Sequence, residues 1–246
     1  MHVVILAGGR GVRLRPYTTA LPKPLMPIGG EYAIIDIILQ QLASQGFTRV
    51  TLAVGHLSSL VKAFVGDGSR WGLRVDYADE DRPLSTIGPL FNFLDRLPEH
   101  FLVMNGDVLT DLDYAALLRD HRASGAPLTI AGYRRQVKIE FGTLETVGGR
   151  LVAFTEKPTL SYGVSMGVYA VSGRTLARYP KNTPLGFDQL VLDLLARGER
   201  PLVHDFDGYW MDIGSPEDYE RANLAFPSMR STLLPAARET RKAVAG

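Results

Sequence analysis

A glycine-rich loop directly after the first apolar segment constrains this chain more than any other feature. The short run His2–Ala7 is typical of a parallel strand buried on both faces, and Gly8, Gly9 and Gly11 follow it. Glycines at the carboxyl end of such a strand let backbone amides approach an anion. Residues 10–23 add four cations and no acid. The segment therefore predicts a polyphosphate-binding loop, and the alternative is a strand-ending turn before a solvated basic loop.

Two common phosphate loops do not fit this segment. Gly9–Leu14 lacks the third glycine of the dinucleotide fingerprint. The chain also contains no Gly-Lys-Ser or Gly-Lys-Thr sequence, which a P-loop requires. The loop therefore belongs to another class.

Hydrophobic patterning predicts an α/β fold. Ile34, Ile38 and Leu42 recur at helical spacing, and Val50–Val54 follows as a second buried strand. Further strands are expected at Leu73–Tyr77, Phe101–Met104 and Leu128–Tyr133, and helices at Leu57–Val65, Gly88–Leu97 and Tyr114–Ser124. This alternation favours a doubly wound, mostly parallel, Rossmann-like sheet.

The pattern changes in the second half, which we expect to be mixed. The segments Gly142–Thr146 and Arg150–Thr155 flank Gly148-Gly149 like the arms of a hairpin. A strand at Tyr162–Ser172 and helices at Phe187–Ala196 and Ser215–Asn223 follow. We expect one domain over residues 1–227, with halves at 1–132 and 133–227, and a surface appendage at 228–246.

Composition excludes several functional classes. The 246 residues carry 27 basic and 26 acidic side chains, a balance that gives no general attraction to nucleic acid or to an anionic membrane. Cysteine is absent, which rules out disulfides and thiolate chemistry. No apolar stretch reaches the length of a membrane span, and no signal peptide pattern opens the chain. The cytoplasm is the expected compartment, and the sequence leaves the oligomeric state, including a homodimer, open.

Two aspartates have the setting of metal ligands. Asp107 follows the apolar strand Phe101–Met104, at the sheet edge where open α/β sheets bind ligands. Asp212 lies among apolar residues, where an ionised carboxylate needs a partner or a cation. A carboxylate pair with phosphate oxygens and waters is the usual setting of Mg²⁺. The alternative makes Asp107 a turn former and Asp212 a residue that leads a helix.

The loop and several later segments resemble the sugar-1-phosphate nucleotidylyltransferase family, most closely its mannose- and manno-heptose-1-phosphate guanylyltransferase branch. The first signature reads Gly-Gly-x-Gly-x-Arg-Leu-x-Pro and continues to Pro22-Lys23-Pro24. The later matching segments, in family order, are Gly66–Gly72, Gly88–Leu90, Asn105–Asp107, Glu156–Pro158, Met166–Tyr169 and Trp210–Gly214. The resemblance covers nearly the whole chain, and it implies a sugar-binding second half.

The resemblance implies a role for each matching residue. Arg13, Lys23 and Asp107 would be catalytic, and Asp107 and Asp212 would hold Mg²⁺. The implied nucleotide contacts are Leu6, Ala7, Gly8, Gly9, Gly11, Arg13 and Gly88. Glu80 and Asp81 lie just ahead of the suspected base loop, and the carboxylate of either could accept from the N–H donors of guanine. The implied sugar-phosphate contacts are Lys23, Gly142, Glu156, Lys157 and Ser165. For Glu80 and Asp81 the alternative is a solvated acidic turn, and for Glu156 and Lys157 an exposed charged turn.

Three positions, in two segments, depart from the family pattern. Pro83–Gly88 carries Ser85 and Ile87 where relatives have smaller residues, so Ile87 is expected to narrow the base or ribose pocket. Ser165 stands where relatives commonly have asparagine. No C-terminal β-helix is expected.

The resulting functional hypothesis is Mg²⁺-dependent transfer of a nucleotidyl group to a sugar 1-phosphate. The best substrates are GTP and mannose or manno-heptose 1-phosphate, and the product would serve polysaccharide or glycoconjugate synthesis. The alternatives are thymidylyl or uridylyl transfer to glucose 1-phosphate, a cytidylyl- or molybdopterin-type transferase, and a non-catalytic regulatory module. Nucleic-acid binding is the weakest alternative.

Overall fold

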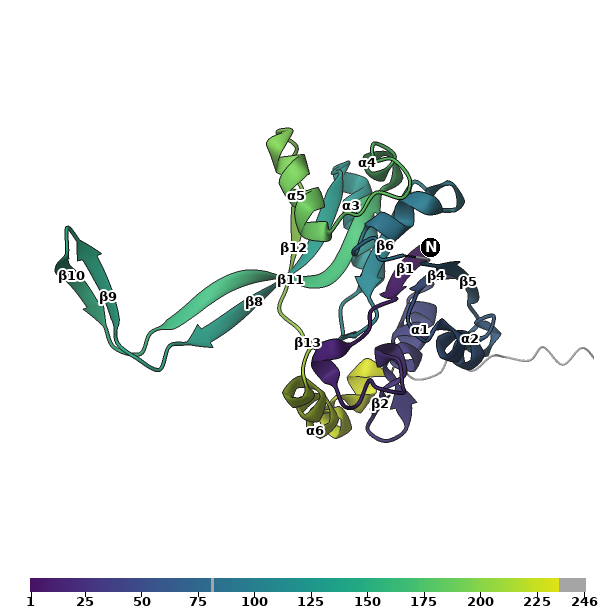
Figure 1. The fold of residues 1–246 in the computed structure, drawn as a ribbon, viewed down its shortest axis with the longest axis horizontal. Helices are drawn as coiled ribbons and strands as arrows, with labels where there is room; N and C mark the ends of the chain where they lie inside the picture. The colour runs from purple at the N-terminus through teal and green to yellow at the C-terminus, as the bar shows by residue number, and fades with distance from the viewer. Residues whose placement is uncertain (81, 235–246) are drawn as a thin grey trace, which may run out of the picture.

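The computed structural model describes residues 1–80 and 82–234. A seven-stranded sheet forms the centre of the body (Figure 1). In spatial order its strands are β12 (Leu202–Phe206), β8 (Leu128–Lys138), β11 (Thr159–Ser172), β6 (His100–Asn105), β1 (His2–Ala7), β4 (Arg49–Val54) and β5 (Arg74–Asp79). All neighbours pair in parallel except β11, which is antiparallel to both β6 and β8. The predicted mostly parallel sheet is confirmed, with β1 near its centre.

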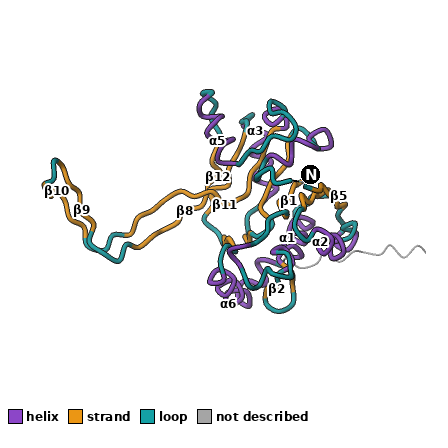
Figure 2. Tube along the Cα trace, viewed as in Figure 1, coloured by secondary structure: helices purple, strands orange, loops and turns teal. Residues whose placement is uncertain are grey.

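Helices cover both faces of the sheet, because alternate strand residues point to opposite sides. Val3 and Ile5 of β1 belong to one core cluster, whereas Val4 belongs to a second. The first cluster includes residues of α1 (Ile34–Ser44), α2 (Ser58–Val65), α3 (Tyr114–Ser124) and α6 (Pro216–Leu233). The second includes residues of α4 (Gly173–Leu176), α5 (Phe187–Ala196) and the 3₁₀ helix η4 (Gly88–Asn92). The fold is therefore doubly wound, as predicted, and Figure 2 shows helices on both sides of the strands.

Local sequence signals place most helix ends. The predicted helix Tyr114–Ser124 matches α3: the Asp113 side chain accepts from the Ala116 amide at 2.7 Å, and left-handed Gly125 ends the helix. The predicted helix Gly88–Leu97 is instead two short 3₁₀ helices, η4 and η5 (Leu94–Arg96). The Gly88 amide donates to the Leu185 carbonyl at 3.1 Å, so this backbone is held by another segment.

The last helix is longer than its sequence signals indicated. The Ser215 cap is present, but α6 runs to Leu233 and includes residues 228–233, which we expected in an appendage. Phe226 and Leu233 lie in the core, and their burial continues the helix past Asn223 and through Pro227. The rest of that predicted appendage, 235–246, lies outside the described residues. None of the described helices is long and apolar enough to cross a membrane, and the described chain contains no β-helix.

An arm, residues 134–164, projects from the body (Figure 1). It consists of the outer parts of β8 and β11 together with the hairpin of β9 (Thr143–Val147) and β10 (Arg150–Thr155). The predicted hairpin turn is present, with both glycines at positive φ, 58° and 79°. The short remaining elements are β2 (Pro27–Ile28), β3 (Tyr32–Ala33), β7 (Val108–Thr110), β13 (Trp210–Asp212), η1 (Val12–Leu14), η2 (Lys23–Leu25) and η3 (Ser69–Trp71).

Candidate active site

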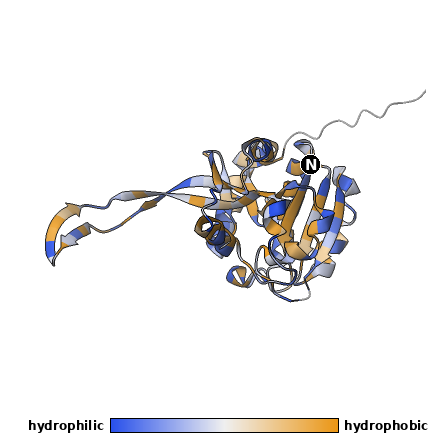
Figure 3. Cartoon of the chain, turned by 90° about the horizontal axis from the view of Figure 1, so that it is seen from above, coloured by the Kyte–Doolittle hydropathy of each residue, from blue (hydrophilic) through white to orange (hydrophobic). Residues whose placement is uncertain are grey.

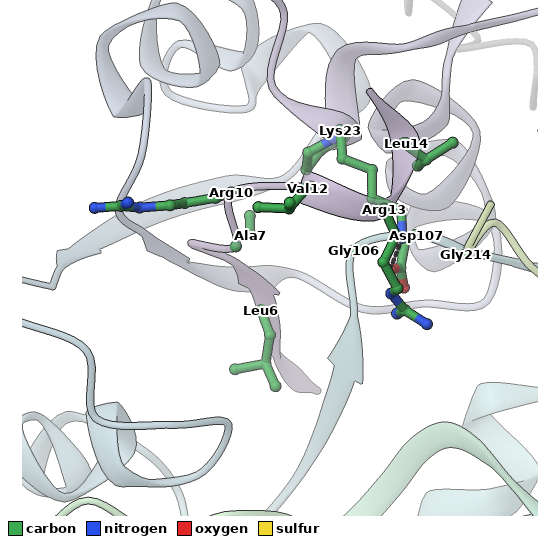
Figure 4. Close-up of a pocket in the computed structure, with 13 residues that line it drawn as sticks. Leu6, Ala7, Arg10, Val12, Arg13, Leu14, Lys23, Gly106, Asp107 and Gly214 are labelled. Carbon is green, nitrogen blue, oxygen red and sulfur yellow. Dashed lines mark hydrogen bonds and ion pairs between the residues drawn. The ribbon is translucent and has the colours of Figure 1, made fainter. Parts of the chain in front are cut away.

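A pocket of about 330 Å³ lies at the carboxyl ends of β1 and β6. It brings together most of the predicted phosphate site (Figure 4). The predicted residues that line it are Leu6, Ala7, Gly9, Gly11, Arg13, Lys23 and Asp107. A neighbouring hollow of about 720 Å³ shares Leu6, Gly9, Arg10 and Asp107 with the pocket and adds Gly8 and Glu80. Together they form one continuous depression.

The loop from β1 to η1 depends on a glycine at position 11. Gly11 has φ 60°, and a Cβ there would lie 2.9 Å from Cγ2 of Thr18. The Thr18 hydroxyl donates to the Gly11 carbonyl at 2.7 Å, which closes the loop. Leu14 is buried as the anchor of η1, while Arg13 remains exposed beside the pocket. Leu14 thus anchors the loop in the core, and the loop holds the Arg13 side chain beside the pocket.

Lys23 and Asp107 form an ion pair at the pocket floor. Lys23 begins η2 after Pro22, and buried Pro24 follows it, so its backbone position is well fixed. Its Nζ donates to Oδ2 of Asp107, and the two side chains are only 12% and 21% exposed. The other oxygen of Asp107, Oδ1, is buried without a hydrogen-bond partner among the described residues. That oxygen has capacity for a further ligand.

Asp212 lies beside Asp107 through strand pairing. Strand β13 pairs antiparallel with β7, which places Asp212 opposite Val108. Burial raises the pKa of Asp212, the charge of Asp107 raises it further, and Lys23 and Arg13 oppose the rise. Two carboxylates that repel each other in a partly buried site favour a cation between them. The four predicted charged residues therefore form one cluster.

This cluster fits Mg²⁺ better than a closed all-protein metal site. No group of three or more His, Cys, Asp or Glu suited to a metal occurs in the described ranges. Mg²⁺ typically takes one or two carboxylates and completes its shell with water and substrate phosphate. Asp107 Oδ1 and the Asp212 carboxylate supply that donor set.

The larger hollow differs from our expectations for the base loop. Oε1 of Glu80 accepts from the Leu84 amide at 2.7 Å, so that oxygen holds the loop. Ile87, expected to narrow the pocket, is fully buried in the second core cluster and does not line the hollow. Gly88 is also buried. Its backbone packs closely against another segment, since a Cβ added there would lie 2.5 Å from the Thr183 carbonyl oxygen. Asp81 lies outside the described residues.

Among the polar residues that line this hollow, sequence reasoning did not assign His56, Arg82 and Asn105 to the site. Asn105 belongs to the matching segment Asn105–Asp107, so its place in that motif could have identified it. His56 follows Gly55 at the end of β4, the carboxyl edge where ligands bind, and the position of that strand end was a second signal. Arg82 had no comparable signal, because it lies in an irregular loop.

The predicted sugar-phosphate residues other than Lys23 do not line the pocket. Gly142, Glu156 and Lys157 lie on the arm, and the Phe154 ring covers Gly142, where a Cβ would come within 2.5 Å of that ring. Ser165 lies at the root of the arm, and its hydroxyl donates to the Tyr169 hydroxyl at 3.0 Å. The structure thus brings most of the predicted phosphate-binding residues together and leaves the predicted sugar-binding residues other than Lys23 away from them.

Comparison with known sequences identifies the family of the chain. The model of the nucleotidyl transferase family matches residues 2–228. The mannose-1-phosphate guanylyltransferase of Mycobacterium tuberculosis is 35% identical over 231 residues, 91% of this chain and 64% of that protein. The mannose-1-phosphate guanyltransferase beta-B of Xenopus laevis is 31% identical, over 89% of this chain and 62% of its own length. The chain thus spans less than two thirds of these relatives.

Solved structures share the fold. HddC from Yersinia pseudotuberculosis is 27% identical with a TM-score of 0.69, covering 92% of this chain and 99% of that one. HddC is also known in complex with GMP-PN. A putative glucose-1-phosphate thymidylyltransferase from Bacillus anthracis has a TM-score of 0.72 over 91% and 94% of the two chains. At 23% identity, this last likeness concerns the fold alone.

Proposed function

Because the chain belongs to the nucleotidyl transferase family, we propose that it transfers a guanylyl group from GTP to mannose or manno-heptose 1-phosphate. The observation that carries this proposal is the cluster of Arg13, Lys23, Asp107 and Asp212 at a glycine-rich loop. Such a loop accepts a polyphosphate through its amides, and the cations neutralise its charge. The products would be a GDP-sugar and pyrophosphate.

The proposed reaction is an in-line displacement that needs no protein nucleophile. An oxygen of the sugar phosphate forms a bond to the α-phosphorus, and the bond from that phosphorus to the bridging oxygen of the β-phosphate breaks. Catalysis then rests on positioning and on charge neutralisation. Arg13 would neutralise the leaving pyrophosphate, and Lys23 the oxygens around the reacting phosphorus.

We propose Mg²⁺ as the cofactor, held by Asp107 and Asp212. The fit rests on the unpartnered Oδ1 of Asp107 and on the raised pKa of Asp212. When bound, Mg²⁺ supplies positive charge to the phosphate oxygens and orients them. Lys23, which already pairs with Asp107, would fix that carboxylate while contacting the phosphate.

The choice of GTP is supported by the relatives and by the polar lining of the larger hollow. The relatives from Mycobacterium tuberculosis and Xenopus laevis are named guanylyl- and guanyltransferases, and HddC was solved with GMP-PN. Glu80, Arg82 and Ser85 line the hollow and offer both acceptors and donors. One carboxylate oxygen of Glu80 remains for a guanine donor, since the other accepts from the Leu84 amide.

A substrate panel tests the proposal. Four nucleoside triphosphates are crossed with mannose, glucose and manno-heptose 1-phosphate, and pyrophosphate release is measured with Mg²⁺. We expect GTP with a manno-configured sugar phosphate to give the highest kcat/KM. A better rate with another nucleotide overturns the guanylyl assignment, and a better rate with glucose 1-phosphate overturns the sugar assignment. Absence of pyrophosphate release in every combination favours the non-catalytic module.

A further inference from the structure

The arm exposes far more apolar surface than its size explains. Of the 17 large hydrophobic side chains exposed in the described residues, eight lie on the arm. Phe141 is 78% exposed, Leu144 63% and Phe154 57%. Contiguous exposed apolar surface on a protruding element marks an interaction site. Figure 3 shows hydrophobic residues along the arm as far as its tip.

These apolar side chains share faces of the ribbon. Residues opposite each other in an antiparallel ladder point to the same side. Val137 lies opposite Leu160, and Arg135 opposite Tyr162, so three apolar side chains lie on one face of the β8–β11 ribbon. The pairs on the other face are Lys138 with Thr159, Gln136 with Ser161 and Arg134 with Gly163. A two-stranded ribbon is marginally stable alone, so its apolar face calls for a partner.

The hairpin at the end of the arm continues the pattern. Leu144 lies opposite Phe154, and Leu151 opposite Thr146, so three exposed apolar side chains again share a face. Gly142 lies under the Phe154 ring, and the Glu156 carboxylate lies close to Gly142. The sugar-phosphate motif is therefore attached to the apolar end of the arm.

The arm begins beside the pocket, but Glu156 and Lys157 lie near its far end, away from the pocket. A Cβ on Gly167 of β11 would lie 2.6 Å from the Asn105 amide nitrogen, and Asn105 lines the hollow. From Ser165 outward the ladder runs unbroken to Thr159. Six residue steps of a strand span about 20 Å, and Lys157 lies two residues further out. Lys157 cannot reach the pocket of its own chain while this ladder is intact.

We propose that two copies of the chain associate through their arms, and that each arm lies across the pocket of the other copy. Glu156 and Lys157 of one copy then meet the sugar phosphate bound beside Lys23 of the other copy. In a two-fold symmetric dimer, the same interface buries both arms and completes both sites. This inference rests on the proposed function, because the sugar phosphate is the ligand that the two sites share.

Mixing two inactive variants tests whether the site is shared. Lys157→Ala damages the arm and leaves the pocket intact, whereas Lys23→Ala damages the pocket and leaves the arm intact. In an equal, re-equilibrated mixture half of the dimers are mixed, and each has one complete site, so activity returns to about a quarter of wild type. Activity no higher than the sum of the separate variants overturns the proposal and favours an arm that bends back onto its own body.

A second measurement does not depend on turnover. The chain has no cysteine, so a single introduced thiol can be labelled cleanly with a photoreactive benzophenone maleimide. With Thr146→Cys, on the arm, we expect cross-linked dimers whose joined peptides include residues 8–13 of the other copy. Ala123→Cys, exposed on α3, is the matched control and should not cross-link there. Exclusively intramolecular products, or none, overturn the proposal.

Oligomeric state gives the third readout. Leu144→Ser with Phe154→Ser should weaken the dimer by about tenfold or more in sedimentation equilibrium, because it removes two exposed apolar side chains that the proposed dimer buries. Leu192→Ser, exposed on α5, should leave the dimer unchanged. A wild-type chain that stays monomeric at micromolar concentration overturns the proposal. An inactive wild type that still cross-links through the arm overturns the proposed function and leaves the arm contact standing.

Discussion

The Ile213 amide donates a hydrogen bond of 3.1 Å to the carbonyl oxygen of Asp107. This bond extends the pairing of β13 with β7 and brings Asp212, the residue before Ile213, beside Asp107. Segments about a hundred residues apart thereby bring Asp212 close to Asp107, which lines the pocket. Because backbone pairing holds the two carboxylates near each other, their negative charges repel, and a bound cation would relieve this repulsion.

Removing either carboxylate should abolish turnover without unfolding the chain. Asp107→Asn and Asp212→Asn should each lower kcat by at least about 10² at saturating Mg²⁺, since each removes a metal ligand. Without Mg²⁺, Asp212→Asn should raise the Tm, because burial and Asp107 disfavour the charged Asp212. Asp95→Asn, exposed on η5, is the control for an aspartate outside the pocket. An unchanged rate in either pocket variant removes that residue from the mechanism.

The two cations should act on the rate more than on sugar affinity. Arg13→Ala and Lys23→Ala should each lower kcat by about 10² or more, within the range for a lost electrostatic stabiliser. Arg15→Ala is a close control, because Arg15 is exposed two residues after Arg13 and does not line the pocket. Steady-state kinetics separates the effects. A defect seen only in the KM for sugar phosphate contradicts the assigned roles.

A side chain at position 8 should disturb the contacts around Glu80. A Cβ there would lie 3.0 Å from Oε2 of Glu80 and 3.3 Å from the Gly55 amide nitrogen. Glu80 also accepts from the Leu84 amide, so Gly8→Ala should disturb the larger hollow and raise the nucleotide KM about tenfold. Glu80→Ala should cause a similar rise, and the double variant should be no worse than either alone. Additive effects contradict a shared cause.

Sequence reasoning found the parts of this site that follow directly from strand ends. Gly8, Gly11 and Asp107 each come just after a short apolar run, and such runs identify buried strands and their carboxyl edge. Asp212 was singled out by its apolar setting and Lys23 by the basic loop, but only the family resemblance gave Lys23 a catalytic role, because nothing local shows which side chains meet at a pocket formed by distant segments. The structure then brought four of the predicted charged residues together.

The arm could not be predicted, because exposure is not a local property. The outer end of β8, residues 134–138, is mostly polar and exposed, so the expected strand ended at Tyr133, and nothing local shows that the backbone continues as a ribbon away from the body. The same limit explains Ile87, which lies in the core although its place in the motif suggested the base pocket. The length of α6 also depended on distant contacts, since its weakly periodic last turns are held by the core around Leu233.

The end of α6 should contribute to global stability. Leu233 is fully buried, so Leu233→Ala should lower the free energy of unfolding by about 2–5 kcal/mol. Leu224 lies on the same helix and is 81% exposed, so Leu224→Ala should change it by less than about 0.5 kcal/mol. Urea denaturation of the two variants gives both values. Equal, small effects would place residues 228–233 outside the cooperative core.

A buried histidine should make the fold sensitive to mild acid. Burial, followed by the nearby charges of His100, Arg122 and Arg174, lowers the pKa of His121 to about 4. The neutral ring bonds Thr129 at 2.9 Å and Ser172 at 3.2 Å, and protonation of both nitrogens disturbs this network.

The sign of this effect follows from proton binding. Below about pH 6.5 the unfolded chain takes up a proton at His121 that the folded chain refuses until about pH 4. His121 therefore contributes stability above its unfolded pKa, and this stability is lost as pH falls towards 4, by about 1.4 kcal/mol per pH unit. Urea denaturation at pH 7.0, 6.0 and 5.0 measures the slope in wild type and in His121→Gln. The variant should be less stable at pH 7, because the ring contacts are lost, and should show a shallower loss towards pH 5. His56→Gln, in the pocket wall, controls for removal of a histidine in general, and an identical slope in His121→Gln and wild type would show that His121 does not carry the acid sensitivity.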